Sequence, residues 1–185
     1  MIIFETSARH VHVSKKDLEI LFGDGYTLTK KKDLSQPGQF VCEEKVEVVG
    51  ERSSAKLSIL GPERKETQVE VSLSDARALG LVAPVRESGD LHDAGPCVIK
   101  GPKGEIKLEH AVICAKRHIH MTPQDAEEYG VKNGEIVKVS VDSPERKLIF
   151  DDVVIRVSSN YALAFHVDTD ESNAAVGAKE AKILK

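Results

Sequence analysis

The chain has 185 residues, of which 41% are hydrophobic and 30% charged, and its formal net charge is -4. This composition suits one folded domain or two small ones, excludes a disordered chain, and lacks the dominant basic face of a nucleic-acid-binding protein. No apolar run is long enough to span a membrane and no secretory signal pattern is present, so we expect a cytoplasmic protein.

The chain begins with a strand-like segment, Ile2–Thr6, which leads into a motif that occurs twice. Residues 9–14 read R-H-V-H-V-S and are followed by Asp17; residues 117–122 read R-H-I-H-M-T and are followed by Asp125 at the same spacing. Seven matched positions at one offset, conservative exchanges included, indicate gene duplication or convergence on one local geometry.

A short helix is expected after each copy of the motif, because Ser14 and Thr122 can cap a first turn. An acid three residues after each cap suits the unpaired backbone amides and the helix dipole, and Gly23 and Gly130 suit a left-handed stop. A third helix is expected within residues 72–81, where a similar cap and stop recur without histidines.

The rest of the chain contains many short β-rich runs separated by Gly and Pro. The expected strands are at residues 40–41, 46–49, 57–60, 69–71, 106–108, 136–141, 148–150, 153–157 and 162–167. Many short strands with three short helices predict a mainly β fold of small β-barrels that carry helical caps, with a junction near Ala115.

The H-x-H pairs are the strongest chemical signal. Alternate residues of a strand share one face, so His10 and His12 would lie about 6.6 Å apart along the strand and could bind one metal ion. His118 and His120 repeat this arrangement. A single pair is more often merely exposed or hydrogen-bonded, but two copies in matched contexts favour metal binding. The arginine before each pair is interpreted as a structural salt-bridge residue.

Each pair needs at least one further ligand. His166 shares a strand face with Ala162 and Ala164, whose small side chains leave space for a site, but a surface-facing histidine fits the pattern equally well. Glu70 lies on the polar face of a short strand, where a carboxylate is usually solvated. Arg64 follows a Gly-Pro turn and by itself carries no functional signal.

Other reactive side chains are interpreted as structural. His92 and His110 are expected at the surface, and Cys114 is too far from His118 along an extended strand to share its metal. The lysines at 30–32 are most often solvated; the alternative is a clamp for a ligand phosphate. The cysteines form no CxxC pair and are expected to be buried, reduced thiols: Cys42, Cys97 and Cys114.

Several blocks of the chain resemble, in order, the phosphate propanoyltransferase family. The match extends from about residue 7 to about residue 177. The blocks are R-H-V-H-V-S (9–14), L-S-Q-P-G-Q-F (34–40), L-G-P-E-R (60–64), T-Q-V-E-V-S (67–72), V-R-E-S-G-D-L (85–91), R-H-I-H-M-T (117–122) and H-V-D-T-D-E-S-N-A-A (166–175).

The resemblance implies two small β-barrel domains, each with short helical caps. Residues 9–115 would form the first domain, and residues 1–8 together with 116–185 would form the second. It also implies an acyltransferase, a phosphotransacylase that reversibly converts a short-chain acyl-CoA (propanoyl-CoA or acetyl-CoA) and phosphate to acyl phosphate and CoA, with two zinc ions per chain.

Site residues follow from the resemblance position by position. One zinc would be bound by His10, His12 and Glu70, with the CoA sulfur as fourth ligand. The other would be bound by His118, His120 and His166, with water or phosphate in its open positions. Arg64 would be the catalytic residue that contacts phosphate. CoA would be contacted by Ser7, Lys32, Leu60 and Asn173.

The chain also departs from the family. Ser58 stands where the family often has an arginine, which puts one CoA contact in doubt. The amphipathic helix that directs family members into bacterial microcompartments is missing before Ile2, so we expect a cytoplasmic enzyme, with the lumen of a bacterial microcompartment as the alternative. Candidate protein partners are further copies of the chain and a CoA-dependent aldehyde dehydrogenase; no nucleic acid or membrane is expected.

Two alternatives to a transferase remain. A binuclear zinc hydrolase, a thioesterase or phosphoesterase, would form a free acid. A non-catalytic, zinc-stabilised barrel would fill every metal position with protein ligands. The sequence offers no fourth ligand for either metal, which favours catalysis.

Overall fold

The computed structural model describes residues 1–184 and divides into two compact units. Unit 2 comprises Ala8–Leu34 and Gly38–Ala115. Unit 1 comprises Met1–Ser7, Ser35–Pro37 and the described residues from Lys116 onward. Every helix that the structure describes is too short or too polar to span a lipid bilayer.

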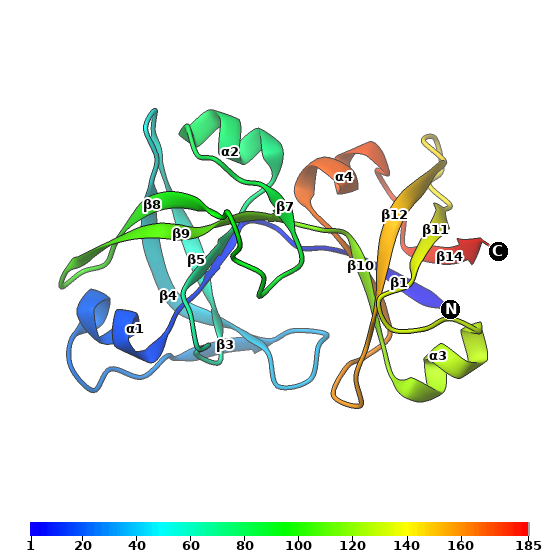
Figure 1. Ribbon diagram of the computed structural model, residues 1–185, viewed down its shortest axis with the longest axis horizontal. Helices are drawn as coiled ribbons and strands as arrows, with labels where there is room; N and C mark the ends of the chain where they lie inside the picture. The colour runs from blue at the N-terminus through cyan, green and yellow to red at the C-terminus, as the bar shows by residue number, and fades with distance from the viewer. Residues whose placement is uncertain (185) are drawn as a thin grey trace. The chain divides into compact units, whose positions relative to one another are not determined.

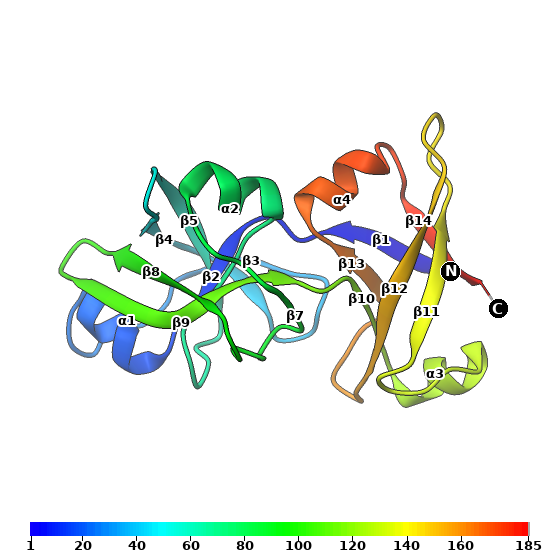
Figure 2. The same ribbon diagram turned by 45° about the horizontal axis from the view of Figure 1, so that its top comes forward.

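Unit 2 contains a closed barrel of six strands with two strands outside the ring. Its strands are β2 (His10–His12), β3 (Lys30–Asp33), β4 (Phe40–Val49), β5 (Ser54–Gly61), β6 (Gln68–Glu70), β7 (Val85–Arg86), β8 (Gly95–Lys100) and β9 (Glu105–Ala115). The ring runs β4-β5-β2-β6-β9-β8 and closes because β8 pairs with both β4 and β9. Figure 2 shows β8 and β9 side by side.

Unit 1 is also a closed barrel. Its strands are β1 (Ile2–Thr6), β10 (His118–Met121), β11 (Ile136–Val141), β12 (Leu148–Val157), β13 (Ala164–Val167) and β14 (Glu180–Leu184). The ring runs β1-β13-β10-β12-β11-β14, and β1 pairs with β14 to close it, as the blue and red strands in Figure 1 show. The predicted mainly β fold of small barrels with helical caps is confirmed.

The two rings repeat one pattern of strand pairing. The first H-x-H strand, β2, is parallel to β5 and antiparallel to β6, and the second, β10, is parallel to β12 and antiparallel to β13. The next strand in each ring is again parallel: β9 beside β6, and β1 beside β13. Each of β1 and β9 therefore completes one barrel and then leads into the H-x-H strand of the other.

Local capping explains the short helices. The three predicted helices are present, and their caps accept hydrogen bonds from backbone amides as expected: α1 (Lys15–Phe22, cap Ser14), α2 (Leu73–Leu79, cap Ser72) and α3 (Pro123–Tyr129, cap Thr122). A fourth helix, α4 (Thr169–Ala174), was not predicted. Asp168 caps it in a capping box: the Asp168 side chain accepts from the Glu171 backbone amide, and the Glu171 side chain accepts from that of Asp168. The helix was missed because this motif directly follows an expected strand.

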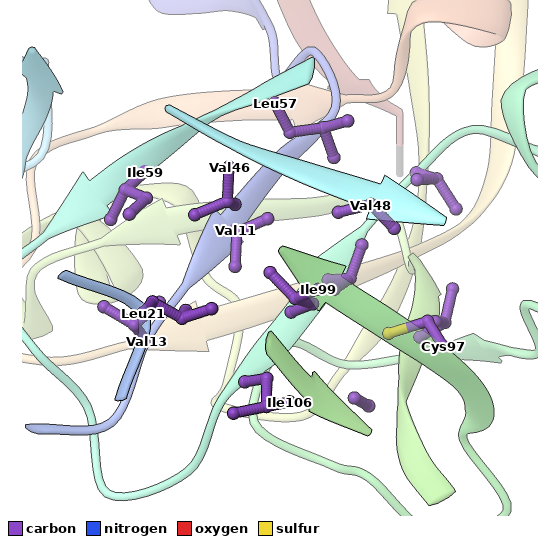
Figure 3. Packing of buried hydrophobic residues seen from close by; sticks show 14 of the residues in the cluster. Val11, Val13, Leu21, Val46, Val48, Leu57, Ile59, Cys97, Ile99 and Ile106 are labelled. Atoms are coloured by element: carbon purple, nitrogen blue, oxygen red, sulfur yellow. The ribbon is translucent and has the colours of Figure 1, made fainter. Parts of the chain in front are cut away.

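The strand alternation inferred for the H-x-H motifs is present. Val11 and Ile119, the central residues of the two pairs, are fully buried, each within the hydrophobic core of its own barrel. Figure 3 shows Val11 among buried aliphatic side chains of unit 2, including Val46 and Val48 of β4. Each core thus holds one H-x-H strand in place and turns its histidines to the opposite face.

Some strands differ from the expectation. Residues 148–150 and 153–157 were expected as separate strands but form one strand, β12, which continues past a positive φ of 53° at Asp152. The sequence did not predict β8, because Pro96 interrupts its pattern; the pairing of β8 with β9 shifts register between Gly95 and Cys97.

Candidate metal centres

The first centre consists of His10, His12 and Glu70. The histidines come from β2, and Glu70 comes from β6, where it pairs in register with His10. His10 Nε2 lies 3.1 Å from His12 Nε2 and 3.5 Å from Glu70 Oε2. All three residues are buried, with exposed fractions of 5%, 3% and 7%. The expectation of a solvated carboxylate at Glu70 is therefore wrong, because the strand face that carries it is covered.

Burial and charge act against each other in this centre. Burial opposes protonation of His10, but the adjacent Glu70 carboxylate outweighs it and the pKa of His10 is raised. Burial dominates at His12 and lowers its pKa to about 4. Burial would raise the pKa of Glu70, yet the charge of His10 and hydrogen bonds from both histidines hold that pKa well below its usual range. A buried anion beside two imidazoles suits a divalent cation.

The second centre consists of His118, His120 and His166. The first two come from β10, and His166 comes from β13, where it pairs in register with His118. The ring centroids are 4.5 to 5.2 Å apart, and the ligand atoms lie within 4.8 Å of one another. The ring centroid of Tyr161 lies 4.1 Å from that of His120. His166 thus faces a histidine cluster and not open solvent.

The donors in both centres suit a metal ion. His10 Nδ1 lies 2.8 Å from the carbonyl oxygen of Ala8, and His118 Nδ1 lies 2.8 Å from that of Lys116. A carbonyl oxygen only accepts, so in the neutral rings Nδ1 carries the proton and Nε2 carries the lone pair. Metal-binding histidines are commonly oriented in this way.

Each centre offers three ligands. Within residues 1–184, no fourth His, Cys, Asp or Glu joins either cluster. Zinc in proteins prefers four ligands, and a site with three protein ligands keeps one position open for water or substrate. Each unit therefore groups three side chains that could bind one metal ion.

Arg64 is linked to the first centre through Ser88. Arg64 Nη1 donates a hydrogen bond of 3.0 Å to Ser88 Oγ, and Ser88 Oγ donates one of 2.7 Å to Glu70 Oε1. The backbone amide of Arg64 donates to the carbonyl of Val13, just beyond β2. Ser88 was not singled out from the sequence, although it lies inside the V-R-E-S-G-D-L block.

Two further residues flank the ring of His166. The amide of buried Gln36 exchanges hydrogen bonds of 2.9 and 3.2 Å with the backbone of Ala162, and its Nε2 lies 3.3 Å from His166 Nε2. Glu5 Oε2 lies 3.6 Å from His166 Nδ1 and accepts a hydrogen bond from Ser35 Oγ. Ser35 and Gln36 lie in the L-S-Q-P-G-Q-F block, which was their one signal in the sequence.

The arginines before the histidine pairs are salt-bridge residues, as predicted. Arg9 Nη1 lies 2.5 Å from Asp75 Oδ1, and Arg117 Nη1 lies 2.9 Å from Glu171 Oε1. Each arginine thereby attaches the start of an H-x-H strand to the helix that follows the third ligand, α2 in unit 2 and α4 in unit 1.

The residues expected to bind CoA belong to both units. In unit 1, Ser7 follows β1 and Asn173 is exposed on α4. In unit 2, Lys32 is exposed on β3 and pairs with Val41 of β4, which pairs with Leu60 of β5. Lys32 and Leu60 therefore lie in one row across three strands. Their CoA contacts stay predictions, as does the effect of Ser58 on CoA binding.

The remaining histidines and the thiols behave as predicted. The His92 side chain is 80% exposed, and His110 contacts the carbonyl of Ala94. The three cysteines form no disulfide bond and are buried.

Comparison with known proteins identifies the family of this chain. A family model described as phosphate propanoyltransferase matches residues 3–178. A phosphate propanoyltransferase of Thermotoga maritima is 57% identical over 176 residues, covering 95% of this chain and 84% of the relative. One of Clostridioides difficile is 52% identical over 184 residues, covering 98% and 88%. One of Enterococcus faecalis is 51% identical, covering 98% and 87%. The chain is therefore an acyltransferase that belongs to the phosphate propanoyltransferase family.

Proposed function

We propose that this protein transfers a short acyl group, propanoyl or acetyl, reversibly between CoA and inorganic phosphate, with a zinc ion in each centre. One observation carries the proposal: each barrel holds three converging side chains that could bind a metal ion, and the first set is hydrogen-bonded through Ser88 to the guanidinium of Arg64. The name of the relatives supports propanoyl transfer to phosphate.

In the proposed reaction an oxygen of hydrogen phosphate attacks the carbonyl carbon of the thioester. A C–O bond forms, the C–S bond breaks, and the proton of the phosphate ends on the sulfur of CoA. When bound, zinc supplies Lewis-acid stabilisation of the thiolate leaving group and of the phosphate. No covalent acyl-enzyme is needed.

Arg64 would bind the phosphate and orient its attacking oxygen. A guanidinium presents paired N–H groups that match two phosphate oxygens, so it fixes orientation as well as charge. Its contact with Ser88 involves Nη1 and keeps the planar group beside the first centre.

The two ligand sets support different tasks for the two centres. His118, His120 and His166 are all neutral as ligands, so a dication there would keep its full charge and attract phosphate or water. Glu70 adds one negative charge to the first set, so that centre would retain less positive charge and suit the single charge of a CoA thiolate.

The remaining assignments concern CoA and the cellular setting. Ser7 and Asn173 from unit 1, and Lys32 and Leu60 from unit 2, would contact CoA, with the exposed ammonium of Lys32 suited to its phosphates. Buried thiols that form no disulfide bond support a reducing compartment such as the cytoplasm. An enzyme that forms acyl-CoA, such as a CoA-dependent aldehyde dehydrogenase, would supply the substrate.

The test is a thiol-release assay with zinc-loaded protein and either propanoyl-CoA or acetyl-CoA, with and without phosphate. We expect thiol only with phosphate, in equal amounts to acyl phosphate trapped by hydroxylamine. Thiol release at the same rate without phosphate would identify a hydrolase. No release under either condition, with unfolding on chelation, would identify a metal-stabilised barrel.

A further inference from the structure

The hydroxyl of Ser88 makes hydrogen bonds with three polar side chains in unit 2. It donates to Glu70 Oε1 at 2.7 Å and accepts from Arg64 Nη1 and from Gln68 Nε2, both at 3.0 Å. A serine hydroxyl has one proton to donate and two lone pairs to accept with. All three are used here, so its orientation is determined by its neighbours.

Gln68 completes this network. Its Nε2 also donates to Glu70 Oε1 at 2.6 Å, and its Oε1 accepts from the backbone amide of Gly89 at 2.7 Å. The Gly89 contact identifies which end of the Gln68 amide is the oxygen. Gly89 has a φ of +99°, a conformation that side chains rarely adopt, so the turn after Ser88 depends on glycine.

The network distinguishes the two oxygens of Glu70. Oε1 accepts from both Ser88 and Gln68, which uses its two lone pairs. Oε2 lies 3.5 Å from His10 Nε2, and Oε1 lies 3.6 Å from His12 Nε2. Because both lone pairs of Oε1 are already used in hydrogen bonds, Glu70 would bind a metal ion through Oε2.

We propose that Ser88, supported by Gln68, is a positioning residue that couples the guanidinium of Arg64 to the metal ligand Glu70. Through one hydroxyl, the position of the carboxylate and the position of the cation depend on each other. The part of this inference that concerns phosphate rests on the proposed function of Arg64; the part that concerns Glu70 does not.

The experiment replaces Ser88→Ala and Ser88→Thr in the full chain. A matched control is Ser54→Ala, because Ser54 Oγ makes a similar contact of 2.6 Å with the carboxylate of Glu47, on exposed strand surface. Zinc affinity is measured by competition with a chromophoric chelator in a His118→Ala background, which retains the ligands of the first centre. The absorption spectrum of the cobalt-substituted protein reports the ligand geometry directly.

Ser88→Ala should weaken zinc binding by about 10- to 100-fold and change the cobalt spectrum, the usual size of effect when a partner of a metal ligand is removed. Ser88→Thr, which keeps a hydroxyl, should have the zinc affinity and the cobalt spectrum of the wild type. Ser54→Ala should change neither of these two measurements. In the chain with both centres intact, Ser88→Ala should raise the KM for phosphate about tenfold, and its effect should not add to that of Arg64→Lys.

A lower melting temperature with unchanged zinc affinity and an unchanged cobalt spectrum would overturn the inference, because Ser88 would then be only a structural residue. If the wild type releases CoA without phosphate, the proposed function fails, and zinc affinity and the spectrum still decide the role of Ser88 toward Glu70. Additive effects of Ser88→Ala and Arg64→Lys on phosphate use would overturn the coupling.

Discussion

Glu70 and His166 occupy equivalent positions in the two barrels, because each pairs in register with the first histidine of an H-x-H strand. The centres therefore share one architecture and differ in one candidate ligand, a carboxylate in unit 2 and an imidazole in unit 1. This difference gives the repeated barrels different charges at the same place, which is the physical basis for assigning them different partners in one reaction.

Removing one histidine should empty one centre only. Each centre lies within its own barrel with its own hydrophobic core, so His10→Ala and His118→Ala should each reduce the zinc content from two ions to about one without unfolding the chain. Elemental analysis after dialysis measures this. His92→Ala, at an exposed histidine, is the control and should retain both ions. One ion or none in the wild type would contradict the two-centre assignment.

Arg64→Lys should impair the use of phosphate more than the use of acyl-CoA. Lysine keeps the positive charge but loses the planar pair of donors, so we expect a loss of about 1–3 kcal/mol, or about 10- to 100-fold in kcat/KM for phosphate. Steady-state kinetics with each substrate varied separately measures the effect. Arg52→Lys, at an arginine whose guanidinium donates to the carbonyl of Arg77, is the control. Normal phosphate kinetics would remove Arg64 from the site.

Gln36→Ala should destabilise unit 1 and loosen the second centre. The amide of Gln36 makes two hydrogen bonds with the backbone of Ala162, so its removal should cost about 1–3 kcal/mol in the free energy of unfolding. Denaturant titration measures stability, and zinc competition measures the affinity of the second centre. Gln124→Ala, on the exposed face of α3, should change neither. Unchanged stability would mean that water replaces the amide at no cost.

Glu44→Gln should reveal a pH-dependent contribution of this buried carboxylate to stability. Glu44 accepts hydrogen bonds from the Tyr26 hydroxyl and the Thr29 amide; burial would raise its pKa, but these contacts lower it. A carboxyl whose pKa is lowered by folding stabilises the protein above its unfolded pKa. The free energy of unfolding of the wild type should exceed that of the variant by about 1–3 kcal/mol at pH 7. The difference should become smaller as the pH falls below 4.5.

Chemical denaturation at several pH values measures this difference, with exposed Glu43→Gln as the control. A difference between wild type and Glu44→Gln that stays constant down to pH 3 would show that Glu44 does not ionise differently on folding.

The thiols of Cys42 and Cys97 should be inert in the folded protein. Burial raises the pKa of Cys97 to about 12, and burial with the charge of Glu44 raises the pKa of Cys42 to about 12. Because the thiolate is the reactive form, neither should react with a disulfide reagent at pH 8 until the chain is unfolded. Spectrophotometric thiol counts before and after guanidinium chloride test this. Rapid reaction of the native protein would contradict the burial and would also interfere with a thiol-release assay.

The sequence by itself determined the features that depend on neighbouring residues. The caps at Ser14, Ser72 and Thr122 were visible because a side chain that accepts from an amide three residues on needs no distant partner. The paired faces of the H-x-H strands were visible because alternation is a property of the strand alone, and burial of Val11 and Ile119 agrees with it.

Only the tertiary structure decided what completes each centre. The local sequence around Glu70 favoured a solvated carboxylate, and that around His166 fitted a surface position equally well. The family resemblance implied that both are metal ligands, but it gave no structural reason. Their positions beside the H-x-H histidines follow from strand register between segments far apart in the chain, as do the contacts of Ser88 with Glu70 and of Gln36 with Ala162. Pairing between distant strands is set by packing of the whole barrel, and no local pattern records it.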